Sequence, residues 1–469
     1  MRRKAKIICT IGPATADRRM ISGLITHGMN VARLNFSHGT HAFHENAIKT
    51  IREEAERLKK TVAIMLDLQG IKIRVGALKG GQVELRKGQA VTVRHGAGPG
   101  DENTIYINYP HLIDASEQGH RMLLADGLLE LQITGKGTDY LKAVVKTGGV
   151  LKEKKGVNLP GLKPVDASFT KKDEADLGLG LRHGVDYVAL SFVRTKNDVL
   201  ALRDFLRRKG EEKLPVIAKI ETPQAMRNLE EILPLVEGIM VARGDLGVEI
   251  PPENVPIAQK SLIEKANKAG KCVIIATEML ESMTERPRPT RAETTDVSNA
   301  ILDGADAVML SQETSVGKYP LETVEMMGRI IGETELSLPV KSRYQHKGTF
   351  SEAVARAATD AAQSVNAKYI IAFTQSGSTA RLVSMLRPEA EIIAFSPSEP
   401  VLRRMALYWG VLARRIKRVK SMDAQFREVE KALLTEKLAK DGDIIVITAG
   451  VPNKQGTTRL MKLHVIGQE

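Results

Sequence analysis

The chain has 469 residues, of which 42% are hydrophobic and 4% aromatic, and its 69 basic against 56 acidic residues give a net charge of +13. This length predicts about three domains with sizeable cores. The positive charge favours anionic partners, whereas the low aromatic content argues against a stacking platform for single-stranded nucleic acid. The two cysteines, Cys9 and Cys272, lie in apolar runs and are too few for a disulfide framework, which fits a reducing cytosol.

The N-terminal segment MRRKAKIICTIGPATA places basic residues before an apolar stretch. Its apolar core is shorter than the roughly 7 to 15 residues of a signal peptide, and Gly12 and Pro13 interrupt it. No apolar run reaches the about 18 residues of a membrane-spanning helix. The expected location is therefore the cytoplasm, with no membrane partner.

Eight short β-branched runs follow one another along the chain. Their continuous apolar character is typical of parallel strands covered on both faces. Between the second and third runs, Ile48, Ile51, Ala55 and Leu58 recur at steps of three and four, which predicts an amphipathic helix. Eight strand–helix units are the number at which a parallel sheet closes into a (β/α)₈ barrel. The expected strands are residues 6–12, 30–36, 61–67, 187–193, 215–221, 238–244, 271–277 and 306–312.

The alternative architecture is a doubly wound open sheet. A TIM barrel is favoured because polar residues follow nearly every expected strand, whereas an open sheet gathers them at one switch point. A long insertion separates the third and fourth strands, and its short alternating strands predict a small β-barrel lid domain. The expected division is a catalytic barrel from 1–70 and 168–338, a lid from 71–167, and a C-terminal open α/β regulatory domain from 339–469.

Charged residues gather at the ends of the fifth and sixth expected strands. Lys219 and Glu221 share one face of an extended strand, as do Arg243 and Asp245 one strand later. Carboxylate oxygens bind Mg²⁺, while Lys and Arg hold phosphate or carboxylate groups, so the pattern suits a hard divalent metal and an anionic substrate. Solvated strand ends with incidental ion pairs are the alternative from these residues alone.

Further motifs stand in chain order at the other strand ends and in the insertion. They are ARLNFSHG (32–39), LDLQGIKIR (66–74), KKGVNLPG (154–161), ATEMLES (276–282), RPRPTRAE (286–293) and LDGADAVMLS (302–311). Together with KIE (219–221) and ARGDLGVE (242–249), they resemble the pyruvate kinase family along essentially the whole chain.

The resemblance implies phosphoryl transfer from phosphoenolpyruvate to ADP, followed by protonation of an enolate to pyruvate. It implies Glu221 and Asp245 as ligands of Mg²⁺ or Mn²⁺, and Lys219 as the cation that stabilises the migrating phosphoryl group. Gly244, Asp245 and Thr277 match residues that bind the substrate carboxylate, together with Lys219. Thr277 is similar to the residue that the family uses to orient the proton donor, and the resemblance implies Ser311 as a relay member.

Phosphate contacts are also implied by the resemblance. Arg33 matches a catalytic residue that touches both substrate and nucleotide, while Asn35, Arg74 and Lys155 match the nucleotide site. Arg33 and Arg74 come from the barrel side, whereas Lys155 comes from the lid. Each of these cations has an alternative interpretation as a solvated surface charge.

The segment after the third strand departs from family members that require K⁺. Those members carry an acidic residue where this chain has Lys72, and Thr and Lys where it has Leu68 and Gln69. A tethered ammonium at Lys72 can supply the positive charge that K⁺ would bring, so we expect no K⁺ requirement. The monovalent-cation region comprises Asn35, Ser37, Asp67 and Leu68.

In the third domain, the turn TQSGST presents backbone N–H groups to a phosphate ahead of a helix. It resembles the family's allosteric effector loop, and 448–458 resembles the second effector segment, although a simple helix N-cap is the alternative. The basic segment 413–420 is interpreted as a solvated face. A phosphorylated effector and a homotetramer are implied by the resemblance. The effector residues are Thr374, Ser376, Gly377, Ser378 and Thr379.

Two other functions remain open from the residues. A different metal-dependent barrel enzyme, such as an aldolase or lyase acting on pyruvate or phosphoenolpyruvate, would need neither the 154–161 segment nor a nucleotide. A non-catalytic anion or nucleic-acid binder would exploit the +13 charge, but the basic residues are dispersed and no nucleic-acid motif is present.

Overall fold

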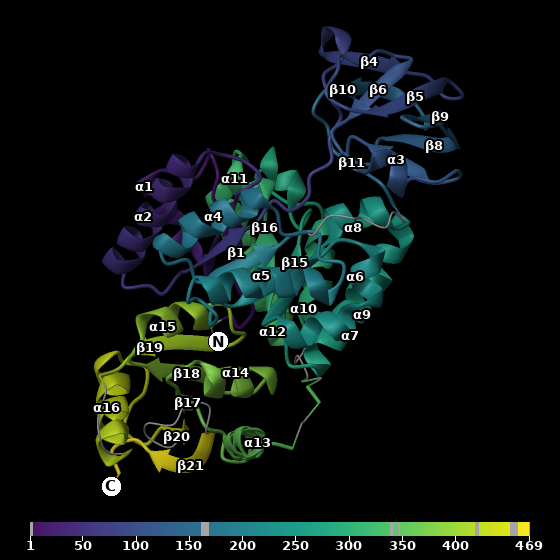
Figure 1. Ribbon diagram of the computed structural model, residues 1–469. Helices are drawn as coiled ribbons and strands as arrows, with labels where there is room; N and C mark the ends of the chain where they lie inside the picture. Colours follow the sequence, from purple (N-terminus) through teal and green to yellow (C-terminus); the bar gives the residue numbers. More distant parts are fainter. Residues whose placement is uncertain are drawn as a thin grey trace.

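The computed structural model describes residues 3–160, 168–337, 342, 344–345, 348–417, 422–450 and 458–468. Figure 1 shows a central barrel wrapped by helices, with a β-rich domain at one end and an α/β domain at the other. The apolar residues of the inserted domain form a cluster of their own, separate from the clusters in and around the barrel and from those of the C-terminal domain.

The eight apolar runs form a closed parallel barrel, in the order β1-β16-β15-β14-β13-β12-β3-β2. This confirms the predicted barrel over the open sheet. One set of strand side chains packs inside the barrel and the other packs against the surrounding helices, which explains why the runs do not alternate. The strands are β1 (Lys6–Thr10), β2 (Val31–Asn35), β3 (Ala63–Asp67), β12 (Tyr187–Leu190), β13 (Val216–Ile220), β14 (Gly238–Ala242), β15 (Cys272–Ala276) and β16 (Ala307–Leu310).

Helices cover the outside of the barrel. The predicted amphipathic helix is α2 (His41–Arg57), which buries Ile48, Ile51 and Ala55. No helix of the described chain is long and apolar enough to cross a membrane. The other helical elements are α1 (Arg18–His27), α4 (Lys171–Arg182), α5 (Lys196–Arg208), α6 (Pro223–Arg227), α7 (Leu229–Ile232), η2 (Leu233–Leu235), α8 (Arg243–Glu249), η3 (Pro252–Asn254), α9 (Val255–Lys268), η4 (Glu281–Thr284), α10 (Arg291–Asp303), α11 (Gln312–Ser315) and α12 (Pro320–Ser337).

The inserted domain consists of short strands around one apolar core, as expected. Its strands form a six-stranded sheet, β11-β7-β8-β9-β5-β6, and a two-stranded sheet, β10-β4, rather than one continuous closed sheet. Isolated β-bridges, such as that between Val75 and Ile107, connect the segment that follows β3 to these sheets. The elements are η1 (Lys79–Gly81), β4 (Gln82–Leu85), β5 (Ala90–His95), β6 (Thr104–Ile107), α3 (Leu112–Ala115), β7 (Arg121–Leu124), β8 (Leu129–Lys136), β9 (Tyr140–Thr147), β10 (Gly149–Lys152) and β11 (Val157–Asn158).

The C-terminal domain is an open sheet in the order β19-β18-β17-β20-β21, with β21 antiparallel to its neighbour. Part of the segment 413–420 belongs to β19, where Ala413 is buried, so the predicted solvated face is wrong for Ala413, whereas Arg414 is half-buried and Arg415 is exposed. Residues 418–420 lie outside the described chain. The elements are α13 (Phe350–Ser364), β17 (Tyr369–Phe373), α14 (Ser378–Met385), β18 (Glu391–Ser396), α15 (Glu399–Met405), β19 (Val411–Arg415), α16 (Met422–Thr435), β20 (Ile444–Gly450) and β21 (Thr458–Val465).

Candidate active site at the barrel mouth

A cavity of about 670 Å³ lies where the carboxyl ends of the barrel strands face the inserted domain. Parallel strands end at the same rim of a barrel, so side chains that are distant in sequence meet there. The inserted domain contributes Asp126 and Asn158 to the cavity wall. From the predicted site, the cavity is lined by Arg33, Asn35, Ser37, Lys72, Lys219, Glu221 and Asp245.

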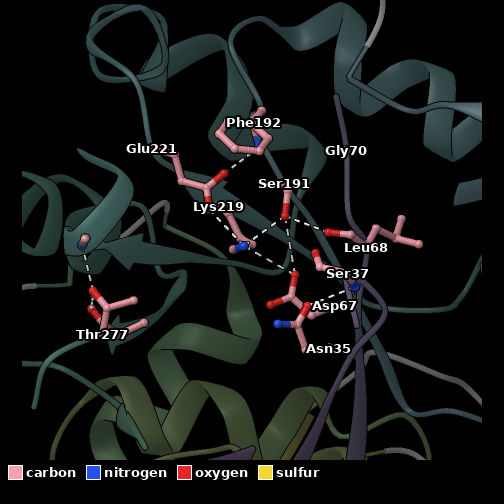
Figure 2. Close-up of polar contacts among 12 residues, drawn as sticks. Asn35, Ser37, Asp67, Leu68, Gly70, Ser191, Phe192, Lys219, Glu221 and Thr277 are labelled. Atoms are coloured by element: carbon pink, nitrogen blue, oxygen red, sulfur yellow. Dashed lines mark hydrogen bonds and ion pairs between the residues drawn. The ribbon is translucent and has the colours of Figure 1, made fainter. Parts of the chain in front are cut away.

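Lys219 is buried at the end of β13, and its ammonium lies among acceptors from three strands. Figure 2 shows Lys219 with Ser191, Asp67 and Glu221 around it. The Nζ atom is 2.8 Å from Ser191 Oγ, 2.8 Å from Glu221 Oε1 and 3.4 Å from Asp67 Oδ1. Burial alone would lower the pKa of Lys219, but the two carboxylates outweigh it and raise this pKa above its ordinary value. The side chain therefore remains a cation.

Asp67 ends β3 and links Lys219 to Arg33. The guanidinium Nε of Arg33 donates to Asp67 Oδ2 at 2.6 Å, and its Nη1 donates to Thr10 Oγ1 at 3.0 Å. Burial would raise the pKa of Asp67, yet Lys219 and Arg33 reverse this effect and hold the pKa below its usual value. The Arg33 side chain is thereby held rigidly at the cavity wall.

Glu221 and Asp245 both face the cavity. The Phe192 N–H donates to Glu221 Oε2 at 2.6 Å, whereas Oε1 is buried without an aligned hydrogen-bond donor among the described residues. Burial raises the pKa of Glu221 to about 7, opposed by Lys219 and reinforced by the charge of Asp245. Two neighbouring carboxylates in a cavity are a hard oxygen donor set that fits a divalent metal ion.

Arg243 does not join this group, contrary to the prediction. The strand ends at Ala242 and the chain turns directly into α8, so Arg243 and Asp245 do not alternate along a strand. The Arg243 Nη1 atom pairs with both carboxylate oxygens of Asp296, at 2.7 and 2.6 Å, and Nη2 donates to Thr277 O at 2.8 Å. Its role in the structure is to hold the loop after β15.

Thr277 adopts a backbone φ of 71°, a left-handed conformation that β-branched residues rarely occupy. Its Oγ1 accepts the Gly244 N–H at 2.7 Å and donates to Ala276 O at 2.6 Å. The Gly244 N–H is therefore satisfied by Thr277 in this structure. Ser311 has a hydroxyl that is buried without a hydrogen-bond partner in the described part of the chain, and it follows β16. Neither hydroxyl belongs to the cavity lining.

Lys72, at the start of the inserted segment, adds a further cation to the cavity wall. Burial and the charges of Lys72, Arg74 and Arg33 lower the pKa of His38, and His38, Lys72 and Arg33 line the same cavity. Arg74 forms an isolated antiparallel β-bridge with Gly156, so the exposed Lys155 lies next to Arg74. Neither Arg74 nor Lys155 lines the cavity itself. In the part of the chain that is described, Lys72 is half-buried and makes no hydrogen bond or ion pair.

Ser191 is a site residue that the sequence patterns did not single out. It follows β12, is buried, and its hydroxyl donates to Leu68 O at 2.7 Å while it accepts from Lys219. The same loop supplies Phe192, whose φ of 52° turns its N–H toward Glu221. The available signal is positional, because Ser191 is a polar residue near the carboxyl end of the expected strand 187–193, where the other barrel strands carry site residues.

The predicted effector residues gather at the start of α14. Thr374 Oγ1 accepts the Gly377 N–H at 2.8 Å, and Ser376 Oγ donates to Ser378 Oγ at 3.1 Å. Thr379 Oγ1 is hydrogen-bonded to Thr458 Oγ1 at 2.8 Å, which joins the first segment to the end of the second. Residues 451–457 of the second segment lie outside the described chain.

Comparison with known proteins agrees with this geometry. The family model described as pyruvate kinase, barrel domain, matches residues 2–324, and the pyruvate kinase alpha/beta domain matches residues 352–464. Pyruvate kinases of Staphylococcus saprophyticus and Geobacillus stearothermophilus are 46% and 45% identical, over 100% and 99% of this chain and 81% of each relative. The crystal structure of a pyruvate kinase from Cryptosporidium parvum superposes with a TM-score of 0.94 at 38% identity, covering 99% of this chain and 96% of that one.

The fold and site define a phosphotransferase built on a (β/α)₈ barrel. The chain belongs to the pyruvate kinase family. Membership implies phosphoenolpyruvate and ADP as substrates, with pyruvate and ATP as products, and enzymes of this family generally use a divalent metal ion. It also decides against the lyase and the non-catalytic binder that the residues alone had left open.

The contacts of Arg243 predict a structural effect of its substitution. Arg243→Lys keeps the charge but loses the paired geometry with Asp296, so the free energy of unfolding should fall by about 1.5–3 kcal/mol in urea denaturation. The matched control is Arg207→Lys, because Arg207 pairs with Asp204 on an exposed surface and its loss should cost under about 0.5 kcal/mol. Equal stability of the two variants would contradict the assigned role.

Proposed function

We propose that this chain catalyses Mg²⁺-dependent phosphoryl transfer from phosphoenolpyruvate to ADP at the barrel-mouth cavity. The observation that carries the proposal is the buried Lys219 ammonium beside two carboxylates that face the same cavity. A loose phosphoryl-transfer transition state needs positioned positive charge more than a nucleophilic side chain. The site supplies such charge from a residue that cannot relax into water.

Lys219 is assigned to the migrating phosphoryl group, and Arg33 to the phosphates of substrate and nucleotide. Both side chains are buried and fixed by Asp67, so their charges are preorganised before substrate binds. Asn35, Arg74 and Lys155 complete the proposed nucleotide site. The support for Arg74 and Lys155 is their adjacency across the bridge to Gly156, at the edge of the inserted domain.

Glu221 and Asp245 are the proposed metal ligands. A bound Mg²⁺ or Mn²⁺ ion would neutralise charge on the substrate and polarise its oxygens. The raised pKa of Glu221, at about 7, reflects burial and a second negative charge that a divalent cation would relieve. Gly244, Asp245 and Thr277 are assigned to the substrate carboxylate, which requires the carboxylate to replace Thr277 at the Gly244 N–H.

Thr277 is also assigned to the orientation of the proton donor that converts the enolate to pyruvate. Its unfavourable φ and its two hydrogen bonds support a side chain held for function, because strained residues persist only where surrounding contacts enforce them. Ser311 is the proposed relay member, supported by a hydroxyl that has no hydrogen-bond partner in the described chain.

The enzyme is further proposed to be an allosteric, cytoplasmic homotetramer regulated by a phosphorylated effector at residues 374–379. The hydrogen bond between Thr379 and Thr458 supports one site made from both effector segments. Exposed apolar side chains at Phe350 and Leu463 support a subunit contact on the C-terminal domain. The proposed domain boundaries are 1–70 with 168–338, 71–167 and 339–469, which the separate apolar core of the inserted domain and those of the C-terminal domain support.

Substitution of Lys219 tests the catalytic proposal. Lys219→Ala removes one preorganised cation and should lower turnover by about 10²- to 10³-fold in a coupled assay of ATP formed from phosphoenolpyruvate and ADP. The matched control is Lys6→Ala, because Lys6 is equally buried and hydrogen-bonded, to Val411 O, but lies at the N-terminal end of β1. Lys6→Ala should lose stability and keep its turnover. Near wild-type turnover of Lys219→Ala would contradict the assigned role.

Independence from K⁺ is the second prediction of this proposal. Lys72 lines the cavity with Asn35 and Ser37, which supports its ammonium as a tethered charge in the proposed monovalent-cation region. Turnover at saturating substrate should be the same in K⁺ and in tetramethylammonium. Lys72→Glu should make turnover depend on K⁺, whereas Lys79→Glu, at an exposed position paired with Asp101, should not. Collapse of wild-type activity without K⁺ and NH₄⁺ would refute the proposal.

A further inference from the structure

The hydroxyl of Ser191 stands between two strand ends and the Lys219 ammonium. Its single proton is donated to Leu68 O at 2.7 Å, because the other acceptor within reach, Asp67 Oδ1, is 3.4 Å away. A hydroxyl that donates in one direction presents its lone pairs in the others. Lys219 Nζ occupies one of these directions at 2.8 Å.

The contacts of Lys219 differ in kind. Asp67 and Glu221 act as counter-ions, at 3.4 and 2.8 Å, and Glu221 Oε1 has no aligned donor among the described residues. The aligned hydrogen bond of the ammonium in the described chain goes to Ser191. The carboxylates hold the charge of Lys219, whereas the hydroxyl is the aligned acceptor among the described residues and fixes where one N–H points.

We propose that Ser191 is a positioning residue for phosphoryl transfer, which orients the Lys219 ammonium toward the cavity. The proposal rests on the role proposed for Lys219. A neutral acceptor suits this task, since a third carboxylate would compete with the phosphoryl group for the same N–H groups. Ser191 is itself held by its hydrogen bond to Leu68 O, just after β3. The orientation of Lys219 therefore depends on the register in which β3, β12 and β13 pair.

The test compares kcat and KM of Ser191 variants in the full-length enzyme. Ser191→Ala removes the acceptor, and Ser191→Cys keeps the approximate volume with a poor acceptor, so a packing defect and a lost hydrogen bond are separated. Both variants should lower kcat by roughly 10- to 100-fold with KM for phosphoenolpyruvate little changed, because a hydrogen bond to a charged group is lost. An unchanged kcat in both variants, or an effect confined to KM, would overturn the proposal.

A matched control is Ser384→Ala. Ser384 is also a buried serine that donates to a backbone carbonyl, Trp409 O, at 2.7 Å, but among the described residues no cation donates a hydrogen bond to it. Its substitution should lower the melting temperature as Ser191→Ala does and leave kcat unchanged. A kcat loss equal to that of Ser191→Ala would reduce the effect to general destabilisation and overturn the proposal.

A double-mutant cycle separates this inference from the role of Lys219. In a Lys219→Ala background, Ser191→Ala should cause little further loss of kcat, since the hydroxyl acts through the missing ammonium. A full additional loss would show that Ser191 acts independently, which overturns the proposal. Wild-type turnover in Lys219→Ala alone would instead refute the role of Lys219, and that outcome is distinct from a failure at Ser191.

Discussion

The Lys219 ammonium is removed from water at the barrel mouth, where a buried charge is tolerated only with paired and hydrogen-bonded partners. Asp67, Ser191 and Glu221 provide these partners from the ends of three strands. Glu221 is close to Lys219 along the chain, whereas Asp67 and Ser191 are distant in sequence. The active-site charge therefore exists only when the barrel is closed and in register.

The same arrangement explains how anionic substrates gain a site in this chain. Lys219 is kept protonated by its carboxylates, and Glu221 is driven toward the neutral form by burial and by Asp245. The cavity thus combines a fixed cation with a carboxylate pair whose repulsion a metal ion would remove. The inserted domain closes one wall, where the Asn158 amide donates to Glu249 Oε1 at 3.2 Å, on the same short helix as Asp245.

The sequence predicted the barrel well because eight continuously apolar runs are typical of parallel strands covered on both faces, and polar residues follow nearly all of them. The sequence predicted the positions of single side chains less well where contacts with distant segments, rather than the local pattern, decide them. Arg243 was placed beside Asp245 on a strand, but the helix begins at that residue and turns the guanidinium toward Asp296. Ser191 carried no pattern at all, since its importance arises from Leu68 and Lys219, which reach it from other strands. Strand β19 was not predicted because two of its five residues, Arg414 and Arg415, are basic, as an edge strand permits.

The central claim is that Glu221 and Asp245 share one divalent cation beside Lys219. Crystals of the full chain grown with Mn²⁺, with diffraction measured on both sides of the manganese absorption edge, test it without reference to turnover. We predict one anomalous peak about 2.0–2.2 Å from carboxylate oxygens of both residues, with the Lys219 ammonium remaining beside Glu221. A Mn²⁺ peak bound elsewhere, with these two carboxylates turned away from each other, would contradict the account.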